Sequence, residues 1–200
     1  MPEEISSERQ RLFIAISLPS KVKARILAAQ STLRSVVEEG VRWTTSEQLH
    51  LTLRFLGSIE TARIPALIDS LQAACASRGM LTLRCAGIGF FPRQRSPRVI
   101  WAGVQEEGDR LRGLHDSIQQ ATKVFSHEAQ ESEFNAHITL GRAKDLNRTR
   151  AEALVKVALS LRDEVFGEWI AKSVELIRSQ LSPRGARYSL VTSVPLEPVP

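Results

Sequence analysis

The 200-residue chain is long enough for one domain or two small lobes that share a core, and no apolar run reaches the ~20 residues of a membrane span. The N-terminal stretch MPEEISSERQ has no basic region followed by an apolar one, so we expect no secretory signal. The two cysteines lack CxxC spacing, so we expect both to be reduced residues of the core, which fits the cytoplasm. The net charge of +5 is compatible with a nucleotide or nucleic-acid substrate without identifying one.

The predicted elements alternate between short strands and helices. The first half of the chain is expected to hold strands at 11–18, 41–43, 49–57 and 80–91, with helices at 21–39 and 60–77. The second half is expected to hold strands at 97–104, 135–142, 169–181 and 186–194, with helices at 109–125 and 149–162. Strand pairs joined by short turns favour an antiparallel α+β arrangement over a doubly wound parallel sheet.

A four-residue pattern, H-x-T-L, occurs twice in strand-like segments. His50 and Thr52 carry it in LHLTLRFLG, and His137 and Thr139 carry it again 87 positions later in NAHITLGR. Alternate side chains of a strand share a face. The leucines and Phe55 should therefore face the core, while the polar face of the first strand holds His50, Thr52 and Arg54. Duplication of an ancestral half explains the repeat better than coincidence.

Two histidines suit a reaction that needs one proton donor and one acceptor, because an imidazole with a pKa near ~6.5 can take either role. The threonine hydroxyls can bond phosphate oxygens, and a guanidinium can neutralise growing charge. Arg142 follows the second motif, but strict alternation would point it at the core, so its participation requires the strand to end or bulge at Gly141. We take His137 as the base and His50 as the acid, although the symmetry of the motifs leaves the reverse open.

Other chemistries find less support. Neither motif offers a third ligand at the spacing of a zinc site, no GxSxG elbow suggests a serine triad, and no glycine-rich phosphate loop is present. His115 and His127 are expected to be solvated surface residues. The arginine-rich loop FPRQRSPR could face phosphate or only solvent.

Around these motifs the sequence resembles the 2H phosphoesterase family, and within it the bacterial RNA 2′,3′-cyclic phosphodiesterases, also called 2′-5′ RNA ligases. The resemblance rests on RLFIAISLP, VRWTTSEQLHLTLRFLG, FPRQRSPRVIWAGV, FNAHITLGRAK and VELIRSQLSPRGARYSL, and covers about residues 11–195. One departure is Ala136, where many relatives have proline before the second histidine. We expect this to affect local stiffness only.

The resemblance implies a bilobal α+β fold with pseudo-two-fold symmetry, in which two antiparallel sheets line a central groove and helices pack outside. Residues 1–10 would be a flexible segment, 11–195 the domain and 196–200 an irregular tail. The family opens a terminal 2′,3′-cyclic phosphate to a 2′-phosphate without metal or cofactor, and some members join tRNA halves through a 2′-5′ linkage. Carried onto this chain, His50 and His137 are the acid–base pair, and Thr52, Thr139 and Arg142 hold the phosphate.

Several points stay open at this stage. Trp43, Phe90 and Phe91 could stack a base beside the groove or belong to the core, and Arg54 could meet the RNA backbone. A catalytically silent protein that binds RNA ends in the same groove is the alternative to an enzyme. With no large apolar helix face left over, we expect a monomer.

Overall fold

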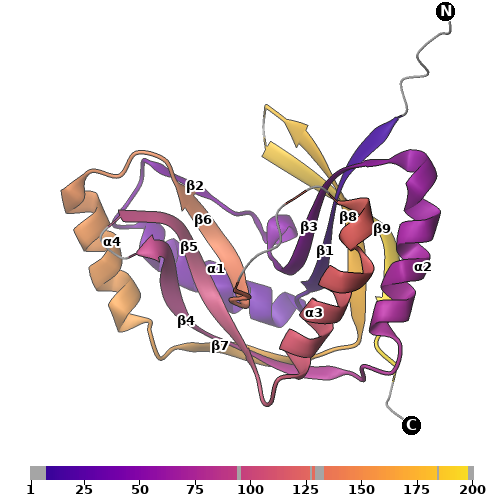
Figure 1. The fold of residues 1–200 in the computed structure, drawn as a ribbon. Coiled ribbons are helices and arrows are strands. Elements are labelled where there is room, and N and C mark those ends of the chain that lie inside the picture. Colours follow the sequence, from indigo (N-terminus) through magenta and orange to yellow (C-terminus); the bar gives the residue numbers. More distant parts are fainter. Residues whose placement is uncertain (1–7, 94–95, 127, 129–132, 184, 198–200) are drawn as a thin grey trace, which may run out of the picture.

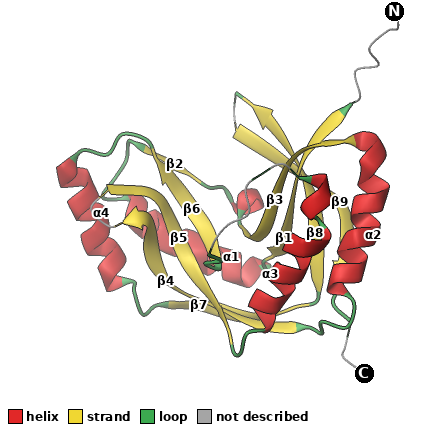
Figure 2. Ribbon diagram, viewed as in Figure 1, coloured by secondary structure: helices red, strands yellow, loops and turns green. Residues whose placement is uncertain are grey.

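The strands of the protein build one curled antiparallel sheet with helices on its outer side (Figures 1 and 2). The computed structural model describes residues 8–93, 96–126, 128, 133–183 and 185–197. The helices are α1 (Ser20–Arg34), α2 (Ile64–Cys75), α3 (Arg110–Ala121) and α4 (Arg148–Ser160). The strands are β1 (Arg9–Ser17), β2 (Val41–Trp43), β3 (His50–Glu60), β4 (Leu81–Arg93), β5 (Ser96–Glu106), β6 (His137–Ala143), β7 (Val165–Ala171), β8 (Ser173–Ser182) and β9 (Gly185–Pro195).

Two lobes face each other across the curl, as the sequence predicts. The strand order is β7-β4-β5-β6-β3-β1-β8-β9, and β2 pairs with the end of β6. The lobe that holds β4 to β7 and β2 carries α1 and α4 outside, whereas the lobe of β3, β1, β8 and β9 carries α2 and α3 (Figure 1). Every pairing between described strands is antiparallel, which confirms the predicted fold class.

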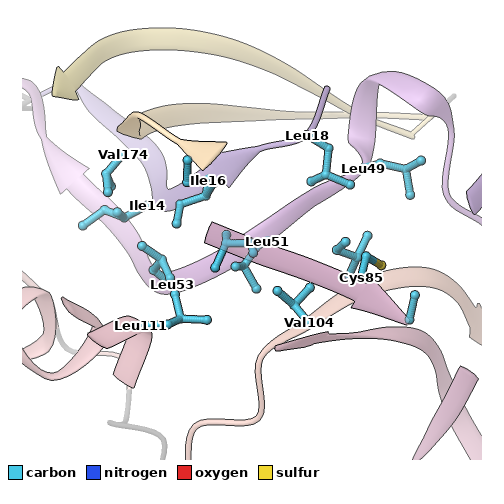
Figure 3. Close-up of a cluster of buried hydrophobic side chains, with 14 of the residues drawn as sticks. Ile14, Ile16, Leu18, Leu49, Leu51, Leu53, Cys85, Val104, Leu111 and Val174 are labelled. Carbon is cyan, nitrogen blue, oxygen red and sulfur yellow. The ribbon is translucent and has the colours of Figure 1, made fainter. Parts of the chain in front are cut away.

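The convex side of the sheet packs on the helices to form the core. Leu53 of the first motif strand lies beside Ile14 of β1 in this cluster, and Leu51 pairs with Ile16 (Figure 3). Burying such a side chain contributes about 1.5–3 kcal/mol, so the apolar face of the motif strand anchors the polar face above it. Cys75 and Cys85 are also fully buried, and burial raises the pKa of their thiols to about 11 and about 12. The predicted core position of both cysteines is confirmed.

Some predicted boundaries were wrong. The segment expected as one strand over 169–181 is two strands, because β7 pairs with β4 in one lobe and β8 pairs with β1 in the other, with Lys172 between them. The chain passes from one lobe to the other in extended conformation, so no turn residues mark the boundary between the two strands in the sequence. The second helix begins at Ile64 because Pro65 fits only in a first turn. The first helix ends at Arg34, five residues before the predicted end.

The termini are described only in part. β1 begins at Arg9, two residues inside the segment expected to be flexible, and β9 reaches Pro195. Residues 1–7 and 198–200 lie outside the described residues. Within the described ranges, no helix is long and apolar enough to cross a membrane.

Candidate active site

The concave side of the sheet forms a groove of about 710 Å³ between the two lobes. Its lining includes five of the seven predicted site residues, namely Trp43, His50, Thr52, Thr139 and Arg142, and does not include His137 or Arg54. Trp43 comes from β2, and the other four come from β3 and β6, the two strands that carry the repeated motif and that meet at the centre of the sheet. The groove therefore adjoins the point where the two motif strands meet.

The two motif strands meet at one point, where Leu51 pairs with Ile138 in antiparallel register. One residue further in each direction, this register sets His50 across from Thr139 and Thr52 across from His137. Each histidine thus has the threonine of the other motif as its cross-strand neighbour. A phosphate placed over this point would have hydroxyl donors beside it and an imidazole on either side.

A bulge after each motif decides which side chains reach the groove. On β6, Thr139 pairs with Trp101 and Gly141 pairs with Ile100, so Leu140 is the extra residue. Leu140 and Gly141 are both buried, and the next side chain, Arg142, turns back to the groove. The bulge that a role for Arg142 requires is therefore present, one residue earlier than Gly141.

The equivalent bulge on β3 corrects the expectation for Arg54. Leu53 is the extra residue there, because Ala15 pairs with Thr52 while Ile14 pairs with Arg54. Arg54 is only 5% exposed, and its guanidinium donates to the carbonyl of Gln119 near the end of α3. A cation at a helix C-terminus stabilises the helix. The prediction that Arg54 shares the groove face with the motif was wrong, because strict alternation fails at the bulge.

Phe55 takes the place in the groove that Arg54 was expected to hold. Its side chain is 47% exposed and lines the groove, although alternation had placed it in the core. Counting from each motif histidine, Phe55 is the counterpart of Arg142. The two halves of the site therefore repeat in backbone and differ in chemistry.

The imidazole of His50 lies between aromatic rings. Its ring centroid is 4.8 Å from that of Phe13 and 5.5 Å from that of Tyr188. Burial lowers the pKa of His50 to about 4, against a hydrogen bond to the backbone of Gln48 that raises it. Lys23 and His137 lower the pKa further. His50 is therefore neutral near pH 7, the state that a base requires.

The imidazole of His137 is oriented by its own strand end. Its Nδ1 lies 2.6 Å from the carbonyl of Asn135, and because a carbonyl can only accept, Nδ1 carries the proton. This leaves Nε2 for the substrate. The rings of Phe91 and His137 meet edge to face, with their centroids 5.1 Å apart. Both histidines thus contact the backbone two residues earlier, at Gln48 and Asn135.

The aromatic candidates divide between groove and core. Phe91 contacts His137, as above, whereas Phe90 is 8% exposed and belongs to the core. Trp43 borders the groove, but its ring packs over Gly141, whose neighbour Arg142 points the other way. Trp43 therefore supports the bulge, and its stacking on a base stays a prediction.

Two further expectations can be compared with the structure. His115 was predicted to be a solvated surface residue, which is wrong: it is 3% exposed and stacks on Phe134 at 4.0 Å between centroids. His127 and Arg95 lie outside the described residues. Arg98 of the arginine-rich loop is exposed and does not line the groove.

Several groove residues were missed in the sequence. Phe13, Arg11 and Tyr188 come from strands far from the motifs in sequence, and only the order of the strands brings them together, whereas Arg42 lies a few residues before the first motif. A repeated motif is a local signal, whereas these neighbours depend on pairing across both lobes. Among the described residues, no three His, Cys, Asp or Glu side chains gather as a metal site would require.

Known proteins share both this fold and this sequence. A family model described as LigT like phosphoesterase matches residues 16–101. The RNA 2′,3′-cyclic phosphodiesterase of Archaeoglobus fulgidus is 31% identical over 89% of this chain and 96% of its own length. The enzyme of that name from Thermus thermophilus is 30% identical over 90% of this chain and 87% of its own.

Solved structures agree with these sequence relatives. The protein TT0787 of Thermus thermophilus superposes with a TM-score of 0.77 at 28% identity, covering 94% of this chain and 98% of that one. E. coli LigT in complex with 3′-AMP gives a TM-score of 0.75 at 26% identity, covering 94% and 99%. The chain belongs to the LigT-like phosphoesterase family.

Proposed function

We propose that the protein hydrolyses the 2′,3′-cyclic phosphate at an RNA 3′ end to a 2′-phosphate, by acid–base catalysis with its two motif histidines. The observation that carries the proposal is the meeting of the motif strands, which sets each histidine across from the threonine of the other motif. Relatives named RNA 2′,3′-cyclic phosphodiesterase support the substrate, and E. coli LigT has been solved with 3′-AMP and with phosphate.

The surroundings of the histidines favour His50 as the base and His137 as the acid, the reverse of the preference drawn from sequence. Neutral His50 takes a proton from water as the water oxygen attacks phosphorus. The bond from phosphorus to the 3′-oxygen breaks, and Nε2–H of His137 donates its proton to that oxygen. The phosphate then remains on the 2′-oxygen. Thr52 and Thr139 donate to the non-bridging oxygens, and Arg142 offsets the growing charge.

The same geometry supports joining as well as hydrolysis. If a 5′-hydroxyl of RNA replaces water, attack at the same phosphorus with loss of the 3′-oxygen yields a 2′-5′ linkage. We propose that this is a second reaction of the site. Incubation of an RNA that ends in a cyclic phosphate with one that carries a 5′-hydroxyl, followed by digestion with a 3′-5′-specific nuclease, tests it.

Hydrolysis is tested with a 2′,3′-cyclic nucleotide in ¹⁸O-labelled water. We expect the 2′-phosphate as product, with one labelled oxygen on phosphorus, resolved by ³¹P nuclear magnetic resonance. A 3′-phosphate product would contradict the assignment of the leaving oxygen. Tight binding of 2′-phosphate ends without any turnover would instead favour the alternative, a protein that only binds RNA ends.

A further inference from the structure

Two arginines face each other directly on the floor of the groove. Arg42 of β2 pairs with Arg142 of β6 in antiparallel register, and both side chains are exposed and line the groove. Like charges directly opposite on one face of a sheet destabilise it. Within the described parts of the chain, neither guanidinium has an ion pair with a carboxylate. Such a pair is stabilised by bound anions.

The opposite wall adds positive charge. Arg11 of β1 lines the same groove, and Tyr188 of β9 lies between the walls. Burial raises the pKa of the Tyr188 phenol, and the positive charges of Arg142, Arg11 and Arg42 oppose that rise. The phenol therefore lies close enough to all three arginines to feel their charge. One carboxylate in the described lining, that of Glu128, lies beside Gly57. The three guanidinium groups carry more positive charge than one phosphate monoanion would neutralise.

The guanidinium of Arg42 lies close to the start of β9. Its Nη2 lies 2.7 Å from the position that a Cβ on Gly185 would occupy, and Gly185 has a φ of +124°, where a side chain is also strained. Beside it, the side-chain amide of Gln48 donates to the carbonyl of Ala186 at 2.7 Å. The start of β9 is thus fastened against the lobe that carries Arg42.

We infer that Arg42 forms a second phosphate subsite, which takes the phosphodiester on the 5′ side of the terminal nucleoside while Arg142 holds the reacting phosphate. The groove then selects oligonucleotide 3′ ends over cyclic mononucleotides. This inference rests on the proposed function, since it assumes that the reacting phosphate occupies the meeting point of the two motifs. It adds a residue and a preference that the motifs do not contain.

The test compares three substrates with the same terminal nucleoside: a 2′,3′-cyclic mononucleotide, a dinucleotide with that cyclic end, and the same dinucleotide with a neutral methylphosphonate linkage. For the wild-type protein, kcat/KM should be about tenfold or more higher for the charged dinucleotide than for the other two, the typical effect of one charge-assisted contact. In a plot of log kcat/KM against log salt concentration, the line for the charged dinucleotide should also be steeper than the lines for the other two substrates. The difference in slope should be about 0.7, the value for one neutralised phosphate of a single strand.

Arg42→Ala and Arg42→Gln should each remove most of that advantage. The matched control is Arg148→Ala, which deletes the same charge at a side chain that is 92% exposed on α4, and it should keep the advantage. Equal kcat/KM for the charged and neutral dinucleotides in the wild-type protein would overturn the inference. So would an equal loss on all three substrates in the Arg42 variants, which would place Arg42 on the reacting phosphate. Absence of turnover on every substrate would instead overturn the proposed function.

Discussion

The low pKa of His50 has a consequence for folding that needs no substrate. In the unfolded chain a histidine titrates near ~6.5, whereas burial lowers the folded value to about 4. Between these values the unfolded chain holds a proton on residue 50 that the folded protein does not, so the free energy of unfolding decreases as the pH falls. From about pH 7.5 to about pH 4.5 the loss from this one group is about 2.5 kcal/mol.

The measurement compares urea unfolding of the wild-type protein and His50→Asn across this pH range. Other groups titrate in both proteins, so their contributions cancel in the difference between the two free energies of unfolding. This difference should change by about 2.5 kcal/mol across the pH range, because the asparagine cannot take up the proton. Thr52→Val is the control, a groove substitution without a titrating group, and its difference from wild type should not vary with pH. A flat difference for His50→Asn would mean that His50 titrates normally, and its assignment as the neutral base would lose its physical basis.

Four other predictions concern the site directly. Arg142→Lys should lower kcat/KM about tenfold or more despite its retained charge, because lysine cannot make the bidentate contact; near-normal turnover would show that Arg142 does not hold the phosphate. Turnover should survive dialysis against a chelator, and loss that a divalent ion restores would contradict the two-histidine mechanism. His50→Ala and His137→Ala should each lower kcat by ~10²–10⁴-fold, with the double variant little worse than either, and substantial hydrolysis in a single variant would refute the pair. Gln30, 3% exposed, donates at 2.8 Å to the carbonyl of the bulged Leu140, so Gln30→Leu should lower the free energy of unfolding by about 1–3 kcal/mol in urea titrations; an unchanged value would mean that water replaces the amide.

The sequence predicts the centre of this site better than its edges. Alternation along a strand correctly paired His50 with Thr52 and His137 with Thr139, because both pairs precede any irregularity in their strands. It failed from Arg54 onward, where the register shifts by one residue. A bulge on these strands carries no glycine or proline at the extra position, which is leucine in both cases. On β6 the glycine directly after the extra residue, Gly141, marks the bulge, whereas nothing beside Leu53 marks the bulge on β3.

The fold class was predicted from strand spacing and from the resemblance, but the neighbours of the histidines were not. Phe13 and Tyr188 reach His50 only because β1 and β9 belong to the same lobe as β3, an order set by long-range pairing. The crossing at Lys172 that makes this order possible was invisible for the same reason. Residues brought together by pairing between distant strands have no spacing in the sequence to identify them.

Repeated motifs with identical chemistry pose a difficulty for acid–base catalysis, because one imidazole must be neutral while the other is protonated. The two bulges resolve it by turning different side chains toward the groove: Phe55 beside the first motif and Arg142 beside the second. Around the first motif the aromatic side chains disfavour a charge on His50, whereas beside the second motif Arg142 supplies a cation for the phosphate. Symmetry of the backbone positions the pair, and the loss of symmetry just beyond each motif supports the different roles that we propose for the two histidines.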